Sequence, residues 1–279
     1  MFKIATLSKS DFPFAINLAN TMNWHMAEAD FEFALTLEPN GCFLLKDGTR
    51  RLGIATCLSY GKVGWFGNLV VEPSSRRKGV GNALVSHAVC YLLGRGVETV
   101  GLYAYSHLVD FYGKLGFKAD CTFSLLHTEK LPEIPAEPLF AIGGKKFSQV
   151  AEFDEKCFGG DRTRLLRKII EVKDNFSSVL LKDNRVVGYV AATVADDALW
   201  VGPLVCLQSR IDTALFLLQS VLGRASGKSV YVVISEKEKV LFDFFSGLGF
   251  AKEFSVSRMF LGKAMGQDCI YIAESLERG

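Results

Sequence analysis

The sequence has little that would place the protein in a membrane or a secretory pathway. Its purely apolar stretches, such as residues 230–234, fall far short of the ~20 residues that a helix needs to cross a bilayer. Polar residues 8–11 interrupt the apolar region that a signal peptide would need near the N-terminus. We therefore expect no membrane partner and a cytoplasmic location.

An excess of charge of one sign is also missing. The 279 residues include 32 Lys and Arg against 30 Asp and Glu, so the formal net charge is only +2. A protein dedicated to nucleic acid usually carries a strong basic field, so we expect no nucleic-acid partner. Intrinsic disorder is excluded as well, because 49% of the residues are hydrophobic and only 22% are charged.

The sequence lacks the cysteine and histidine spacings of metal sites. Its seven cysteines show no C-x-x-C spacing and mostly have apolar neighbours, so we expect buried reduced thiols rather than disulfides or a zinc site. The four histidines show no H-E-x-x-H pattern, and no G-x-S-x-G nucleophile motif occurs. We therefore predict no metal. The residues concerned are Cys42, Cys57, Cys90, Cys121, Cys157, Cys206 and Cys269, with His25, His87, His107 and His127.

What the sequence does contain is a long internal repeat. Each half has a hairpin pattern of strand, Lys-Asp turn and strand, then a Trp-x-Gly segment, then a segment that ends in Leu-Gly-Phe. The three matches keep the same order and lie about 135 residues apart, which indicates a duplicated domain rather than a solenoid. The matched pairs are residues 44–55 with 180–190, 65–70 with 200–205, and 111–117 with 244–250.

Proline is concentrated between the two copies. Three of the seven prolines fall in residues 131–138, where the fixed φ of proline favours a stiff surface linker. We therefore divide the chain into a first domain (residues 1–130), a linker (131–138) and a second domain (139–279). Each domain alternates helices with strands, which predicts an α/β fold with a central mixed sheet and helices on both faces.

The most informative segment runs from residue 68 to residue 89. Residues 69–71 are typical of a strand, residues 72–75 break it, and residues 76–82 form a basic, glycine-containing turn before an amphipathic run. Glycines let backbone N–H groups face a ligand, and the dipole of the following helix favours an anion. The turn fits a pyrophosphate, although it matches neither the Walker A pattern nor G-x-G-x-x-G. An ordinary basic turn at a helix start is the alternative.

Two motifs in the first half resemble those of the GCN5-related N-acetyltransferase (GNAT) superfamily. They are V-x-P-x-x-R-x-x-G-x-G over residues 71–81 and F-Y-x-K-x-G-F over residues 111–117, and the resemblance spans residues 2–129. It implies tandem GNAT-like domains and acetyl-CoA as donor, with pantetheine beside the strand and pyrophosphate on the amides of the turn. One departure is Tyr105, where the family often has asparagine. The donor-binding residues so implied are Leu69, Val70, Val71, Arg76, Arg77, Lys78, Gly79, Val80, Gly81 and Asn82.

The same resemblance puts Tyr112 in the family's general-acid position. A phenol with a pKa near ~10 can protonate the departing thiolate, and the acceptor amine, with a pKa of ~10.4, must first lose a proton. A backbone N–H of Val70 or Val71 is expected to stabilise the carbonyl oxygen. The alternative for Tyr112 is an aromatic core residue beside Phe111.

The base and the acceptor pocket have weaker signals. Glu72 adjoins the strand end and is a candidate base acting through water, but a solvated turn position suits it equally. If the family layout holds, residues 23–31 and the face that the second domain presents build the acceptor pocket. Trp24 then supplies an apolar wall, Glu28 attracts an amine cation, and Asp30 caps the following helix.

The second half repeats the order of strands and helices but lacks the residues that we expect to bind the donor and to act in the reaction. Its D-x-x-x-F-G-x-D-R pattern over residues 154–162 resembles the C-terminal domain of two-domain GNAT members. Residues 207–214, which match the basic turn, contain no glycine and a single cation, and Phe245 stands where the first half has Tyr112. We predict that this degenerate GNAT-like domain is non-catalytic.

Together these patterns predict an N-acetyltransferase that transfers acetyl from acetyl-CoA to a primary amine of a small molecule or peptide by direct attack. One alternative is a non-catalytic acyl-CoA-binding sensor or regulatory protein. Another is a transferase of longer acyl chains. An aminoacyl-tRNA donor is disfavoured, because it would call for an extensive basic surface.

Overall fold

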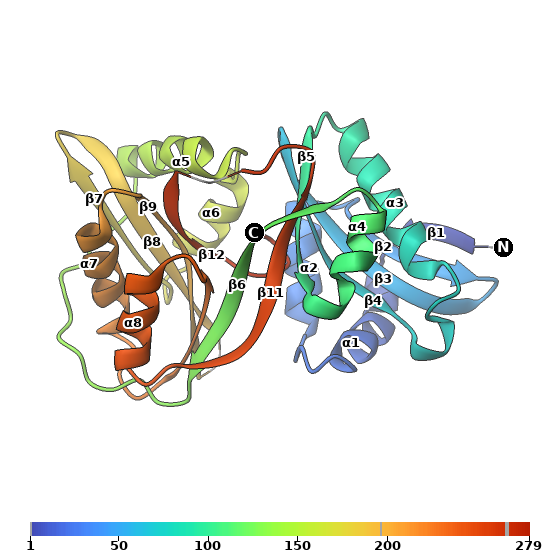
Figure 1. Cartoon of the computed structure of the whole chain (residues 1–279), viewed down its shortest axis with the longest axis horizontal. Coiled ribbons are helices and arrows are strands. Elements are labelled where there is room, and N and C mark those ends of the chain that lie inside the picture. Colours follow the sequence, from blue (N-terminus) through green and yellow to red (C-terminus); the bar gives the residue numbers. More distant parts are fainter. Residues whose placement is uncertain (1, 196, 266–267) are drawn as a thin grey trace. The chain divides into compact units, whose positions relative to one another are not determined.

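The computed structural model describes residues 2–195, 197–265 and 268–279, and the chain folds as two compact units. The first unit ends at Leu102 and also includes Arg278, and the second contains residues 103–277 and Gly279. Each unit has helices packed on a sheet with both parallel and antiparallel pairs (Figure 1). The predicted α/β class with mixed sheets is confirmed.

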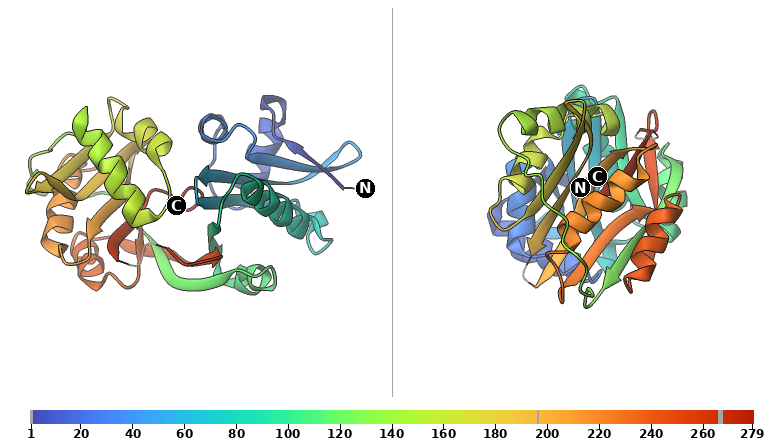
Figure 2. Two further views of the ribbon diagram at one scale, coloured as in Figure 1. Left: turned by 90° about the horizontal axis from the view of Figure 1, so that it is seen from above. Right: turned by 90° about the vertical axis from the view of Figure 1, so that its left-hand side faces the viewer.

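In the first unit the strands follow one another across the sheet in chain order, with only β4 and β5 parallel. Ile54 of β3 packs with Phe12 and Phe31 of two helices, whereas a Cβ added at the neighbouring Gly53 would lie 3.2 Å from Leu84 of a third helix. Alternate residues of β3 thus face opposite sides, and Figure 2 shows α1 and α2 on one side and α3 on the other. The elements are β1 (Phe2–Thr6), η1 (Lys9–Asp11), α1 (Phe12–Asn20), α2 (Glu28–Leu37), β2 (Cys42–Asp47), β3 (Arg50–Tyr60), β4 (Val63–Val71), η2 (Pro73–Ser75), α3 (Val80–Gly94) and β5 (Thr99–Tyr105).

The sheet of the second unit has the order β11-β6-β10-β12-β9-β8-β7. Residues of α7 and α8, such as Leu217 and Phe245, share an apolar core with Val190 and Val232 of the strands. The helices α5 and α6 lie behind the sheet in Figure 1, and α7 and α8 lie in front. The elements are η3 (Ser106–Leu108), α4 (Val109–Lys114), β6 (Lys118–Thr128), α5 (Lys145–Phe158), α6 (Thr163–Ile170), β7 (Phe176–Lys182), β8 (Arg185–Ala195), β9 (Ala198–Leu207), α7 (Ile211–Leu222), β10 (Ser229–Ser235), α8 (Lys239–Gly247), β11 (Ala251–Leu261) and β12 (Cys269–Ala273).

The repeat seen in the sequence is a repeat of structure. The hairpin β2–β3 turns through Gly48, and the hairpin β7–β8 turns through Asp183 and Asn184, all three with positive φ. The following strand pairs in parallel with the next one in both copies, as β4 with β5 and β9 with β10. The lysine-aspartate turns therefore form the same hairpin twice, as predicted.

The compact units divide inside β5 rather than at the proline-rich segment. The last strand of the first repeat, β6, pairs on one side with β10 and on the other with β11, both from the second repeat. The segment after it is also anchored there, because the N–H of the buried Leu131 donates to the carbonyl of Lys228 at 2.9 Å. Long-range strand pairing, which the local pattern does not reveal, thus draws residues 103–138 into the second unit.

The expectation of reduced thiols is wrong for one pair of cysteines. Cys157 of α5 and Cys269 of β12, 112 residues apart, form a disulfide. The other five cysteines are free thiols, and burial raises the pKa of Cys42 and Cys206 to about 12, which keeps them protonated and inert. None of the helices in the part of the chain that the structure describes is both long and apolar enough to span a membrane.

Candidate active site

The basic turn leads directly into the N-terminus of α3, as its sequence predicts. Gly79 has a φ of 85° and precedes the first residue of the helix, Val80. The first hydrogen bond of α3 runs from the N–H of Ala83 to the carbonyl of Gly79, at 3.0 Å. The N–H groups of Val80, Gly81 and Asn82 lie before this bond and therefore have no carbonyl acceptor within the helix. A Cβ added at Gly79 would meet no heavy atom within 4 Å. The helix end is therefore open, and its amides and dipole suit a phosphate.

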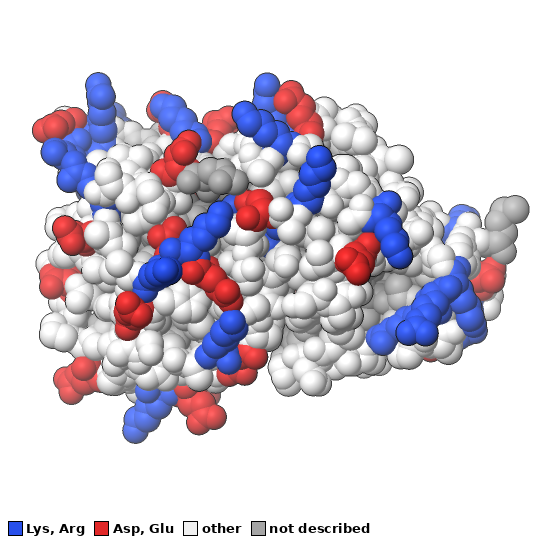
Figure 3. All heavy atoms as spheres, in the orientation of Figure 1, with Lys and Arg blue, Asp and Glu red and all other residues white. Residues whose placement is uncertain are grey.

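The three cations of the turn differ in their surroundings. All three are exposed, and Arg77 has a φ of 60°. Arg76 instead donates from Nε to the Val71 carbonyl at 3.1 Å and approaches the Met22 sulfur at 3.8 Å. Arg76 thus fixes the turn to the end of β4, while the other two remain available to an anion. Over most of the face in Figure 3 positive and negative side chains are interspersed, and Lys and Arg side chains gather at its lower right.

A hollow of about 170 Å³ lies beside this turn in the first unit. Its lining combines two cations, a carboxylate and a hydroxyl with apolar side chains. These groups suit a ligand with both charged and apolar parts. The lining residues are Phe2, Asp47, Arg50, Leu52, Ser75, Lys78 and Val80.

The strand before the turn changes its pairing where the predicted pantetheine site begins. The last pair between β4 and β5 is Trp65 with Gly101. Beyond it, no strand among the described residues pairs with residues 66–71 on the side of β4 that faces β5. Leu69, Val70 and Val71 belong to this stretch. Backbone groups on such a free strand side can bond to the amides of a ligand.

A bulge that the two motifs do not predict shapes the same stretch. Asn68 has a φ of 49°, and its Nδ2 donates to the Thr56 hydroxyl at 3.2 Å, where the register between β3 and β4 shifts. Asparagine tolerates this left-handed conformation better than most residues. Asn68 is therefore the sequence feature from which the bulge could have been predicted. The bulge sets the direction in which the amides of Val70 and Val71 point.

Glu72 is occupied by the turn that follows β4. Its carboxylate accepts hydrogen bonds from Ser74 and Ser75 and pairs with Arg50 at 3.1 Å. The hydrogen bond from Ser74 is the main cause of a lowered pKa for Glu72. A lowered pKa makes a carboxylate a weaker proton acceptor. Of the two alternatives for Glu72, a base acting through water and a residue of the turn, this geometry therefore favours the second.

Tyr112 lies near the end of α4, in the second unit, and is 5% exposed. Its ring makes edge contacts with Phe111 and Phe117, at centroid distances of 4.9 and 5.8 Å. Burial raises the pKa of Tyr112 well above its ordinary value, so the phenol stays protonated through the neutral range. The hydroxyl therefore has a proton to donate, although the raised pKa also makes it a weaker acid than an ordinary phenol.

The residues predicted for the acceptor pocket belong to the first unit. Trp24 lies between α1 and α2 and packs against the apolar core that includes Val70. Glu28, the first residue of α2, is exposed. Asp30 caps this helix from its third position, accepting the Ala27 N–H at 2.8 Å, because the helix starts three residues before the predicted start.

The second repeat lacks the features of the first at the matching positions. Among residues 207–211, all of which the structure describes, no positive φ occurs, and Asp212 lies in the first turn of α7. A carboxylate in the first turn of the helix disfavours the binding of an anion at that helix end. In the part of the chain that the structure describes, no group of three or more His, Cys, Asp or Glu residues could hold a metal ion.

Comparisons with known proteins agree with the two motifs. A model of the acetyltransferase (GNAT) family matches residues 4–117, and a model of an acetyltransferase (GNAT) domain matches residues 150–271. GCN5-related N-acetyltransferase 2, chloroplastic, of Arabidopsis thaliana is 43% identical over 53 residues, which are 19% of this chain and 20% of the relative. Serotonin N-acetyltransferase 2, chloroplastic, of Oryza sativa subsp. japonica is 43% identical over 53 residues, 19% of this chain and 26% of the relative. The matched stretch thus spans only a minor part of these relatives.

Solved structures show the same fold over nearly the whole chain. A proposed acetyltransferase from Pyrococcus horikoshii aligns with a TM-score of 0.81 at 21% identity, covering 100% of this chain and 96% of that one. A tandem GNAT protein from the clavulanic acid biosynthesis pathway aligns with a TM-score of 0.64 at 15% identity, covering 95% and 100%. The chain belongs to the GNAT acetyltransferase family, with one GNAT domain in each half.

Proposed function

We propose that the protein transfers the acetyl group of acetyl-CoA to a primary amine of a small molecule or peptide. The observation that carries the proposal is the turn from Arg76 to Asn82. It joins β4, one side of which pairs with no described strand along residues 66–71, to the N-terminus of α3, which follows Gly79 and has no side-chain cap. Acetyl-CoA, when bound, supplies the thioester that reacts. Its pyrophosphate fits the amides of Val80, Gly81 and Asn82 with Arg77 and Lys78 near it.

Each residue then has a separate task in the reaction. The N–H of Val70 or Val71 donates to the thioester carbonyl oxygen as negative charge develops there. The amine nitrogen forms a bond to the carbonyl carbon, the carbon–sulfur bond breaks, and the sulfur takes a proton from the Tyr112 hydroxyl. Water removes the proton that the amine loses, with Glu72 holding the turn. Trp24 and Glu28 contact the acceptor as an apolar wall and a counter-charge.

The test follows the release of free thiol from acetyl-CoA with a panel of primary amines. The wild-type protein should release thiol with at least one amine, and Tyr112→Phe should bind acetyl-CoA normally but release little. Tight binding of acetyl-CoA with no thiol release above hydrolysis for any amine would contradict the transferase and support the acyl-CoA sensor.

The length of the acyl group is tested by thermal stability. A ligand present at 100 times its Kd raises the free energy of unfolding by ~2.7 kcal/mol, so at equal concentration the tighter donor gives the larger shift. Acetyl-CoA should stabilise the protein at least as much as longer acyl-CoAs do. A larger shift with a long chain would overturn the acetyl assignment.

A further inference from the structure

The two repeats differ in the space beyond the end of their parallel strand pair. In the first repeat the pairing of β4 with β5 stops at Trp65, and no described strand continues along that side of β4. In the second repeat the pairing of β9 with β10 stops at Val201 and Val232. Beyond that point β12 enters between them.

The register shows which positions β12 covers. It pairs antiparallel with β9, with Ile272 opposite Leu204, Tyr271 opposite Val205 and Ile270 opposite Cys206. On its other side it pairs with the end of β10, from residue 233 to residue 234. Residues 204–206 are the counterparts of residues 69–71 in the repeat, which is the stretch that the proposed function assigns to the donor.

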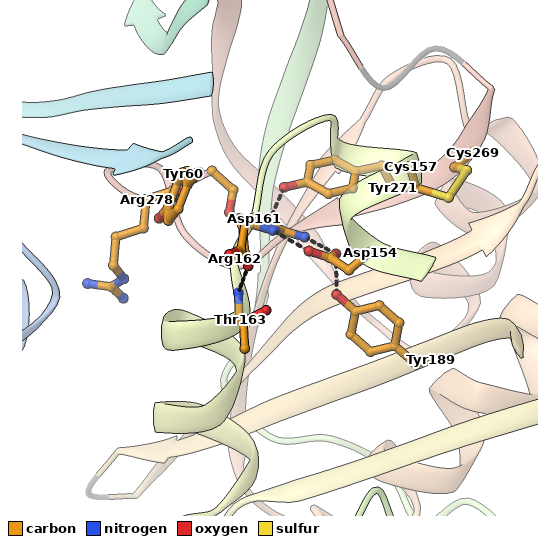
Figure 4. A network of polar contacts seen from close by, with 11 residues as sticks. Tyr60, Asp154, Cys157, Asp161, Arg162, Thr163, Tyr189, Cys269, Tyr271 and Arg278 are labelled. Carbon is orange, nitrogen blue, oxygen red and sulfur yellow. Dashed lines mark hydrogen bonds and ion pairs between the residues drawn. A yellow bond between two sulfur atoms is a disulfide. The ribbon is translucent and has the colours of Figure 1, made fainter. Parts of the chain in front are cut away.

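β12 is attached to the neighbouring helix by two independent connections. Its first residue, Cys269, forms the disulfide with Cys157 of α5. Two residues later the Tyr271 hydroxyl accepts a hydrogen bond from Arg162 at 2.9 Å. Arg162 in turn donates two hydrogen bonds, of 3.0 and 2.6 Å, to Asp154, which lies one turn before Cys157 (Figure 4).

The polar connection is deeply buried. The side chains of Arg162 and Asp154 are both 0% exposed. The Tyr189 hydroxyl donates to Asp154 at 2.5 Å, and the Arg162 guanidinium lies 4.0 Å from the centroid of the Phe158 ring. The D-x-x-x-F-G-x-D-R pattern therefore serves to hold β12 in place.

We propose that β12 is a built-in occupant of the donor position in the second repeat, and that the Cys157–Cys269 disulfide is a redox-sensitive restraint on it. The inference rests on the proposed function, because the donor position is defined by the first repeat. A dithiol reduces the disulfide by giving two electrons and two protons to the two sulfurs. The S–S bond breaks, two thiols remain, and the reagent leaves as a cyclic disulfide.

The first experiment measures amide hydrogen exchange by mass spectrometry before and after treatment of the full chain with dithiothreitol. Amides of β12 should exchange on the order of tenfold faster after reduction, because the strand then loses the disulfide and keeps only the hydrogen bonds to Arg162, β9 and β10. Cys157→Ser should behave like the reduced wild type and respond no further to the dithiol, and Cys90→Ser, at an exposed free thiol, should behave like the oxidised wild type. Complete reduction with no change in β12 would overturn the restraint.

A second variant loosens β12 from the other side. A methyl group added at Gly202 of β9 would overlap the carbonyl oxygen of Ala273 in β12, so Gly202→Ala should speed exchange in β12 even with the disulfide intact. The matched control is Gly247→Ala, because a Cβ there meets nothing within 4 Å. If Gly202→Ala does not fold, the dithiol experiment on the wild type still decides.

Binding stoichiometry separates this inference from the proposed function. Calorimetric titration of the oxidised wild type with acetyl-CoA should give one site per chain, and the ligand should slow exchange in residues 66–71 but not in residues 204–207. Two sites per chain, or added protection of residues 204–207, would overturn the built-in occupant. No binding at all would overturn the proposed function and leave the exchange results for β12 standing.

Discussion

Tyr112 and Phe245 occupy equivalent places in two copies of one turn. The Tyr112 carbonyl accepts hydrogen bonds from the N–H groups three and five residues later, at 3.0 and 3.1 Å, and the Phe245 carbonyl does the same at 3.1 and 3.1 Å. Gly116 and Gly249 follow with φ of 92° and 81°. The backbone is thus the same twice, but only the first copy carries a hydroxyl that can donate a proton.

Tyr112→Phe should lower kcat by about 10²–10⁴, the usual contribution of a general acid. The Kd for acetyl-CoA should stay unchanged, because the predicted donor contacts are backbone amides of other segments. Tyr91→Phe, which removes a hydroxyl bonded to Glu38 in the first unit, is the control and should keep its kcat. Steady-state kinetics and calorimetry measure both quantities, and an unchanged kcat in Tyr112→Phe would remove Tyr112 from the mechanism.

Asn68 offers a test of the bulge in β4. Valine disfavours the φ of 49° seen at this position, whereas glycine adopts it freely. Asn68→Val should therefore lower kcat by roughly tenfold or more as the amides of Val70 and Val71 turn away from the carbonyl oxygen. Asn68→Gly should keep most of the activity, and equal losses in the two variants would point to the side chain instead.

Asp11 makes the stability of the first unit depend on pH. Burial raises its pKa, but hydrogen bonds from Ser8 and Arg51 outweigh this and lower the pKa to about 2, below the ordinary value of 3.8. The folded state therefore releases this proton more readily than the unfolded chain does. The resulting stability, about 2 kcal/mol, is present above pH ~4 and is lost as the pH falls toward 2.

The substitution Asp11→Asn should remove that contribution at neutral pH and flatten the loss of stability between pH 4 and 2. Asp174→Asn, at an exposed carboxylate, is the control and should follow the wild type. Urea unfolding at a series of pH values measures the effect. A parallel pH dependence in Asp11→Asn and wild type would show that another carboxylate is responsible.

The buried pair of Asp154 and Arg162 should behave as a unit. Arg162→Met leaves the Asp154 carboxylate buried without its counter-charge, which should lower the free energy of unfolding of the second unit by about 3–5 kcal/mol. Asp154→Leu combined with Arg162→Met removes both charges and should recover part of that loss. Urea unfolding of these two variants and of Asp154→Leu alone gives the coupling, and additive losses in the double variant would contradict it.

The sequence predicts the parts of this molecule that depend on local signals. The duplicated hairpins, the turn before Val80 and the helix at Asp30 follow from turn residues, glycine and capping groups, and each lies within a dozen residues. The predicted helix start at Asp30 differs from the observed start by three residues, because a capping side chain can act from the third helical position as well as from the N-cap.

The rest depends on pairings between distant segments. The placement of β6 between β10 and β11, and of β12 between β9 and β10, arises from strand contacts up to well over 100 residues apart along the chain. The disulfide of Cys157 with Cys269 has the same origin, since its sequence separation of 112 gives no local spacing to recognise. These pairings explain why the compact units divide at β5 and not at the prolines.

The central claim is that the amides after Arg76 bind the diphosphate of acetyl-CoA, and Gly81→Val tests it most directly. A calorimetric titration compares this variant with Thr213→Val, at the matching helix start of the second repeat. The account predicts that Gly81→Val weakens acetyl-CoA binding by about 10²-fold or more, because branched bulk blocks the approach of phosphate to the backbone, while Thr213→Val binds like the wild type. Wild-type affinity in a folded Gly81→Val protein would contradict it.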